Sequence, residues 1–208
     1  MITSYEEMNV NCYLELRQVA EMEGEPIDKQ VAEIAILTGQ DEISIMNLKL
    51  DKYRELSANL SFLTKPYPRR KVQKSYDVGK YELVLNKDVS DITTKQFIDF
   101  QTFGHDAEKN MVKMLSIVLI PKGHTYDNGY DIADVQEEIG EHLCIIDANE
   151  IYAFFLSKLK KLIYPILTYS EKMIRRMKKG EEKDRLKAQM KEARQMLDII
   201  RNGDGLIW

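Results

Sequence analysis

The longest run of helical periodicity lies in the last third of the chain and constrains the fold more than any other feature. Apolar side chains recur there every three or four residues, at Ile151, Phe154, Phe155, Leu159, Leu162, Ile163, Ile166, Met173, Ile174 and Met177. Asp147 can cap this segment, and a helix unbroken to Lys178 would be ~48 Å long. We expect Pro165 to kink this helix near Lys161.

A second helix is expected after Gly180, from Glu181 to about Asn202. Its apolar residues follow a 4-3-4-3 spacing, at Leu186, Met190, Ala193, Leu197 and Ile200. Two heptads are too few for an independent coiled coil, so we expect an antiparallel helical hairpin that bends at Gly180. The chain ends in NGDGLIW, and this apolar tail either packs against its own fold or binds elsewhere.

The preceding residues predict shorter helices and one β-hairpin. Helices are expected from Ser4 to Gly24, from Ile27 to Thr38, after Asp51, after Thr93 or Thr94, from Asn110 to Ile120 and after Asp131. Residues 41–46 are expected to form a turn, and SYDVGKYELVL (75–85) alternates around Gly79 as a hairpin does. The predicted fold class is mostly α: a multi-helix bundle with one small β-hairpin and a C-terminal antiparallel helical hairpin.

This pattern divides the chain into five regions. They are an N-terminal helical region (1–64), a basic connector with the β-hairpin (65–92), a central helical region (93–168), a basic helical hairpin (169–202) and an apolar C-terminal tail (203–208). Charge is divided unevenly among them, because residues 158–201 hold 14 Lys or Arg against 6 Asp or Glu, whereas the whole chain holds 30 against 34. An acidic body with a basic end could pair with itself, with an acidic partner or with a polyanion.

Composition restricts the class of protein. No stretch approaches ~18 uninterrupted apolar residues, so no membrane span is expected. The acidic N-terminus lacks the basic-then-apolar order of a secretory signal, and two cysteines, Cys12 and Cys144, indicate a reducing compartment. We therefore expect a soluble, intracellular, globular protein that does not contact a membrane.

Catalytic and metal-binding motifs are not apparent, so we expect no enzyme, no cofactor and no metal site. The segment from Asp127 to Glu138 has carboxylates at positions 1, 5 and 12 of a calcium loop, but Ile132 stands where the sharp turn requires glycine. A helix-turn-helix around Gly39 would present Asp41 and Glu42 to DNA phosphates, which repel carboxylates. Neither segment has the residues that its motif needs.

Binding of a partner fits the sequence better than catalysis does. Two basic segments could contact a polyanion, through Arg69, Arg70, Lys71, Arg175, Arg176, Lys178 and Lys179. The chain also holds ten methionines, which adapt to varied partners, although a methionine-rich core explains that number equally well. The candidate partner-binding residues are Met173, Met177, Met190, Leu197, Leu206, Ile207 and Trp208.

Several local strings resemble a family of tailed-bacteriophage proteins that comprises tail-assembly chaperones and uncharacterised morphogenesis proteins. They are LTG (37–39), LSFL (60–63), TTKQFIDF (93–100), LIPKG (119–123), YDNGYDI (126–132) and the pair Phe154-Phe155. These are packing and turn strings rather than chemical signatures, and the basic hairpin after about Tyr169 is not part of the pattern. The resemblance implies a non-enzymatic protein that binds the hydrophobic tape-measure protein and recruits tail-tube subunits in the cytoplasm of the bacterial host.

Two other functions stay open. A structural virion protein of the head–tail connector or neck, in a ring near the portal, would place the basic end against DNA or an acidic neighbour. A nucleic-acid-binding protein is the third alternative. The expected partners are therefore other phage morphogenesis or virion proteins and a second copy of the chain, with nucleic acid as a secondary contact.

Overall fold

The computed structural model describes residues 1–86, 92–104, 106–177, 180, 184–188, 190, 191, 194 and 198. It is mostly helical with a small antiparallel sheet, which confirms the predicted fold class. The elements are α1 (Val10–Glu21), α2 (Pro26–Thr38), α3 (Glu42–Met46), α4 (Leu50–Asn59), a 3-10 helix η1 (Leu60–Thr64), β1 (Ser75–Val78), β2 (Tyr81–Leu85), α5 (Thr94–Gly104), α6 (Met111–Val118), β3 (Leu119–Pro121), α7 (Ile132–His142) and α8 (Ile145–Arg176).

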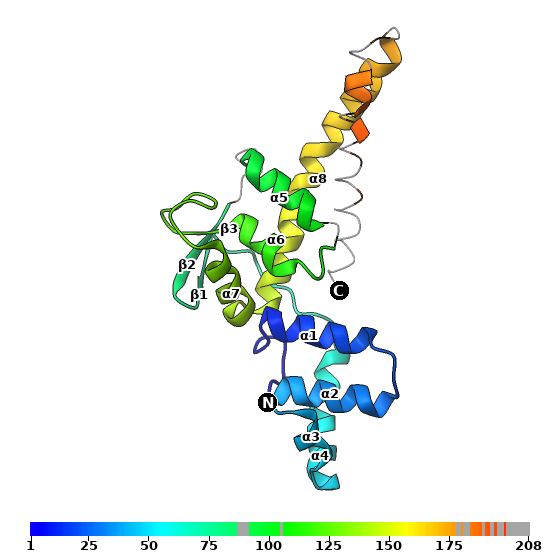
Figure 1. Cartoon of the computed structure of the whole chain (residues 1–208), viewed down its shortest axis with the longest axis vertical. Helices are drawn as coiled ribbons and strands as arrows, with labels where there is room; N and C mark the ends of the chain where they lie inside the picture. The colour runs from blue at the N-terminus through cyan, green and yellow to red at the C-terminus, as the bar shows by residue number, and fades with distance from the viewer. Residues whose placement is uncertain are drawn as a thin grey trace.

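The molecule is elongated (Figure 1). Helices α1 to α4 form its lower part, and α5, α6, α7 and the sheet form its middle. Helix α8 starts in the middle part and extends to the upper end. The two ends of the molecule are therefore built from opposite ends of the chain.

The predicted β-hairpin is confirmed, and a third strand joins it. Val78 lies opposite Tyr81, which leaves a two-residue turn with Gly79 at its first position. Gly79 has a φ of +52°, a left-handed conformation that glycine adopts without steric cost. Strand β3 pairs with β2 through Val84 and Ile120, so the helix predicted to reach Ile120 ends two residues earlier.

The first helix begins five residues later than predicted. Its N-cap is Asn9 rather than Ser4, and the Asn9 side chain accepts a hydrogen bond from the Cys12 amide at 2.8 Å. The residues before it pair with distant parts of the chain: Ile2 N–H donates to the Leu37 carbonyl at 2.8 Å, and Ile145 N–H donates to the Met8 carbonyl at 2.9 Å. These long-range bonds replace the helical bonds that local periodicity predicts.

Helix α8 organises the core. It is a single helix of 32 residues that continues through Pro165, and it begins at Ile145, so Asp147 lies in its first turn rather than at the cap. Residues 145–149 are all buried, which places the start of the helix inside the protein on every side. Beyond Leu159 the helix buries only one face, as expected for an amphipathic element that leaves the core.

Candidate interaction surfaces

The C-terminal segment folds back onto α8 and uses part of its apolar pattern for internal packing. Arg194 Nη2 donates to Glu171 Oε1 at 3.0 Å, across 23 residues of sequence, as an antiparallel hairpin requires. Among the predicted partner-binding residues, Met190 is buried in the core cluster, whereas Met173 and Met177 are half-buried. The remaining four, Leu197, Leu206, Ile207 and Trp208, lie outside the described residues.

The outer half of α8 carries a basic face, which we define as Lys161, Tyr164, Tyr169, Lys172, Arg175 and Arg176. At 100° per residue these six side chains fall within an arc of about 140° around the helix. All are exposed, and the two tyrosines keep 51% and 66% of their surface in solvent. Glu171 borders this arc and is paired with Arg194. Lys178 and Lys179, predicted beside them, lie outside the described residues.

The other predicted polyanion contact is attached to α8 by ion pairs. Arg70 Nη1 donates to Asp147 Oδ2 at 2.8 Å, and Arg69 Nη1 lies 3.5 Å from Glu150 Oε1. Asp147 is buried, whereas Lys71 is exposed. Two of the three cations therefore fix the connector to the first turns of α8, a structural role that the basic composition did not reveal.

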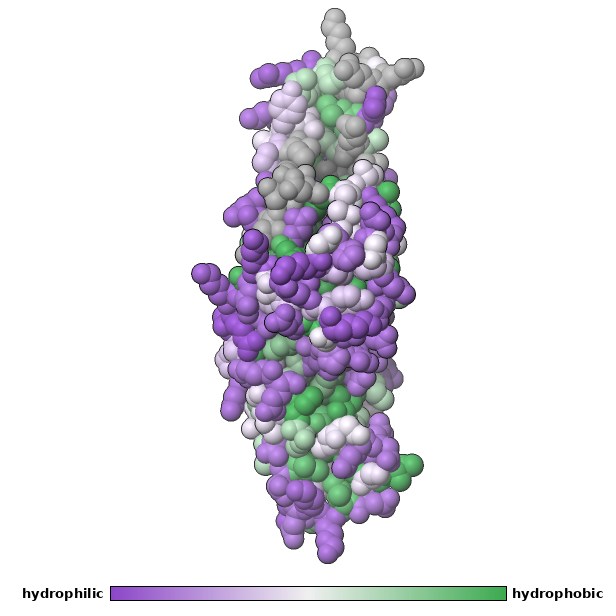
Figure 2. All heavy atoms as spheres, turned by 90° about the vertical axis from the view of Figure 1, so that its left-hand side faces the viewer, coloured by the Kyte–Doolittle hydropathy of each residue, from purple (hydrophilic) through white to green (hydrophobic). Residues whose placement is uncertain are grey.

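An exposed apolar group at the lower end was missed in the sequence. Residues 41–46, expected as a turn, form helix α3, whose cap Asp41 accepts a hydrogen bond from the Ser44 amide at 2.8 Å. We define Ile43, Met46 and Leu50 as the apolar tip; they keep 69%, 64% and 60% of their surface in solvent. Figure 2 shows hydrophobic side chains reaching the surface in this lower part. The signal was the 3-4 spacing of these residues, beside a buried Ile45.

A second surface that sequence reasoning missed lies at the corner between α1 and α2. Residues 21–28 are all exposed, and we define them as the acidic corner. Its four carboxylates are Glu21, Glu23, Glu25 and Asp28, and Met22 and Ile27 lie among them with more than half of their surface in solvent. The next cation, Lys29, donates to the Ala20 carbonyl at 3.1 Å. The corner therefore combines concentrated negative charge with apolar contact area.

Two cavities lie beside aromatic or basic side chains. One of about 510 Å³ is lined by Tyr5, Tyr13 and Tyr67, whose rings pack together with 4.2 Å between the centroids of Tyr5 and Tyr67. Burial raises the pKa of Glu33 in its wall. The other, of about 580 Å³, lies beside β2 and β3 and is lined by the cations Lys74 and Lys122 among apolar side chains.

Among the described residues, no three His, Cys, Asp or Glu side chains lie close enough to hold a metal ion. Comparison of the chain with protein families, curated proteins and solved structures gave no match. None of the described helices combines the length and the hydropathy that crossing a membrane requires. Function must therefore be inferred from the surfaces themselves.

Proposed function

We propose that this protein is a non-enzymatic phage assembly protein, a tail-assembly chaperone that binds a hydrophobic helical client such as the tape-measure protein in the host cytoplasm. The observation that carries the proposal is the apolar tip, three large apolar side chains on one short segment that are each at least 60% exposed. A gathered apolar group of this kind is typical of protein-binding surfaces. The local strings that resemble phage chaperones support the same function.

The spacing of the apolar tip suits a helical client. Ile43 and Met46 lie three residues apart on α3, and Leu50 opens α4, so the tip gathers exposed apolar side chains from two successive helices. An amphipathic helical client can lay its apolar face on such a group. Removing the exposed parts of these three side chains from water contributes roughly 3–6 kcal/mol. The flexible thioether of Met46 lets the surface adjust to successive turns of a long client.

Co-expression tests this function. The chain should increase the soluble yield of a co-expressed phage tape-measure protein and should co-purify with it. Ile43→Asp with Met46→Asp should abolish both effects, because a carboxylate cannot be buried against an apolar helix without a partner. The matched control is Phe97→Asp with Ile98→Asp on α5, which places the same charges on another exposed apolar pair. Equal loss in both variants, or no complex with the unchanged chain, would contradict the proposal.

A structural role in the head–tail connector is the second candidate, and the basic face favours it. Four exposed cations on one side of a projecting helix suit an acidic neighbour in a ring or a DNA end. Mass spectrometry of purified virions separates the two functions. A chaperone should be absent from the particle, whereas a connector should be present at a fixed copy number.

A further inference from the structure

We propose that the acidic corner of one copy binds the basic face of a second copy, so that the chain associates head to tail. The two surfaces match in charge, because the corner carries four carboxylates and the basic face carries four cations. They also match in composition, because each places two exposed apolar or aromatic side chains among its charges: Met22 and Ile27 on the corner, Tyr164 and Tyr169 on the face. Such pairing of opposite potentials with apolar contact is how interfaces acquire specificity.

The charges on both surfaces are available to a partner. Within the part of the chain that the structure describes, none of the four corner carboxylates forms an ion pair. Lys172, Arg175 and Arg176 likewise make no ion pair with a described residue, whereas Glu171 at the border is already neutralised by Arg194. Among the residues that the structure describes, each of the two surfaces as defined therefore presents unpaired charge of a single sign.

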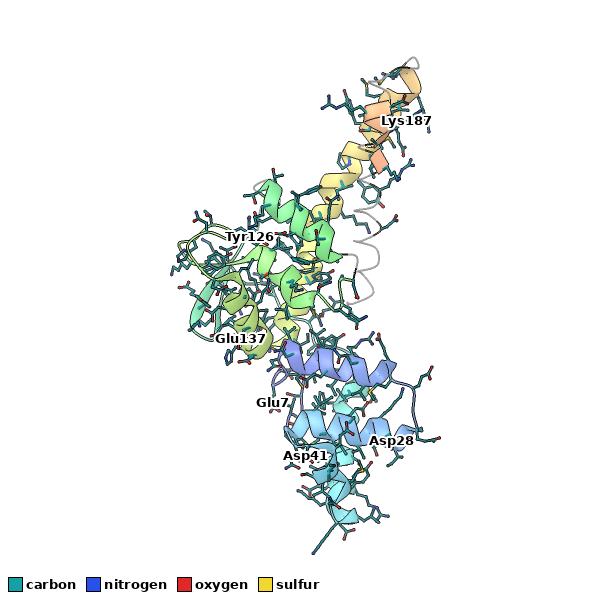
Figure 3. All side chains as sticks on the ribbon, viewed as in Figure 1. Glu7, Asp28, Asp41, Tyr126, Glu137 and Lys187 are labelled. Atoms are coloured by element: carbon teal, nitrogen blue, oxygen red, sulfur yellow. The ribbon has the colours of Figure 1, made fainter. Side chains whose placement is uncertain are left out.

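The two surfaces cannot satisfy each other within one molecule. Asp28 of the corner lies in the lower part, and Lys187, beside the outer half of α8, lies near the upper end (Figure 3). Helix α8 carries the basic face from the middle part towards the upper end, away from the corner between α1 and α2. A contact between two different surfaces on two copies leaves one of each unused, so association continues into a ring or an open chain.

Charge reversal tests this contact in the full-length protein. Sedimentation velocity of the unchanged chain at low salt should show species that grow with concentration. Glu23→Lys with Glu25→Lys, or Arg175→Glu with Arg176→Glu, should each weaken association at least about tenfold, because the altered surface then carries two charges of each sign and no net charge. All four substitutions in one chain should leave association equally weak, because neither surface then carries net charge.

Matched controls separate the contact from net charge. Glu6→Lys with Glu137→Lys, and Lys71→Glu with Lys74→Glu, change the net charge equally at exposed positions elsewhere and should leave association unchanged. A monomeric unchanged chain, insensitivity to either reversal, or a folded four-fold variant that associates like the unchanged chain would overturn the proposal. Binding of a DNA duplex that is lost with Arg175→Glu and Arg176→Glu, without self-association, would instead assign the basic face to a polyanion. The apolar tip is intact in every variant, so co-expression with the client tests the chaperone function separately.

Discussion

Replacing Arg70 by methionine tests whether the connector is held by its ion pair with Asp147. The substitution keeps the aliphatic stem and removes the guanidinium, so the Asp147 carboxylate stays in the first turn of α8 without its partner. Loss of one partner from a fully buried pair costs about 3–5 kcal/mol. Asp147 keeps only 12% of its side chain exposed, but Arg70 keeps 39%, and the positive end of the helix dipole remains beside the carboxylate. We therefore expect a loss of about 2 kcal/mol.

Urea denaturation followed by circular dichroism measures this loss. In a chain of this size about 2 kcal/mol corresponds to a fall of about 4–8 °C in Tm. Lys71→Met, at the exposed neighbouring cation, is the control and should change stability by less than about 0.5 kcal/mol. A double-mutant cycle with Asp147→Asn should give a coupling of at least about 1 kcal/mol. Equal stabilities of Arg70→Met and Lys71→Met, or zero coupling, would refute the reasoning.

Three further predictions concern a thiol, a carboxyl and a glycine. Burial, with a contribution from the charge of Glu15, raises the pKa of the Cys12 thiol to about 11. Ellman's reagent at pH 8 should therefore modify the half-buried Cys144 in the native protein, and should modify Cys12 only after unfolding. Burial raises the pKa of the Glu33 carboxyl above its value in the unfolded chain, so ionisation of this group destabilises the fold once the pH exceeds the unfolded-state pKa. Glu33→Gln should therefore raise Tm at pH 7. Near pH 3.5, where the carboxyl is protonated in both states, the variant should lose this advantage. Gly79→Ala should cost more stability than Gly39→Ala in urea denaturation. Both glycines have positive φ, but a Cβ at Gly79 collides with the Glu138 carboxylate, whereas a Cβ at Gly39 meets open space.

Elements whose geometry depends on neighbouring residues were predictable. The turn at Gly79 needs a left-handed residue between two alternating strands, and both signals are local. Thr93 caps α5 as expected, its hydroxyl accepting from the Gln96 amide at 3.2 Å, and Asp131 caps α7 through the Ala133 amide at 2.9 Å. The length of α8 follows from a periodicity that runs over many turns.

Elements that depend on distant residues were not predictable. Leu119 to Pro121 continue an apolar run that favours a helix, and only the pairing of Ile120 with Val84 makes them a strand. The predicted start of α1 was wrong, because the Met8 carbonyl accepts a hydrogen bond from the distant Ile145 amide and the helix begins only after Met8.

The candidate surfaces also combine a feature that was predictable from the sequence with one that was not. Basic and apolar residues could be found in the sequence, but their exposure could not. The sequence predicts a surface cation at Arg70, but this side chain pairs with the buried Asp147 carboxylate. It likewise predicts a partner-binding residue at Met190, which is buried in the core. Ile43 and Met46 read as part of a turn and are the most exposed apolar residues of α3. Tertiary packing decides which apolar side chains of a helix remain exposed to solvent, and the periodicity of the sequence does not contain this information.

Because α8 continues through Pro165, it forms a projection of defined length. Its residues 160–176, where the helix leaves the core, amount to about 26 Å of helical rod towards the upper end. In any array of copies joined end to end, this rod would fix the interval at which subunits recur.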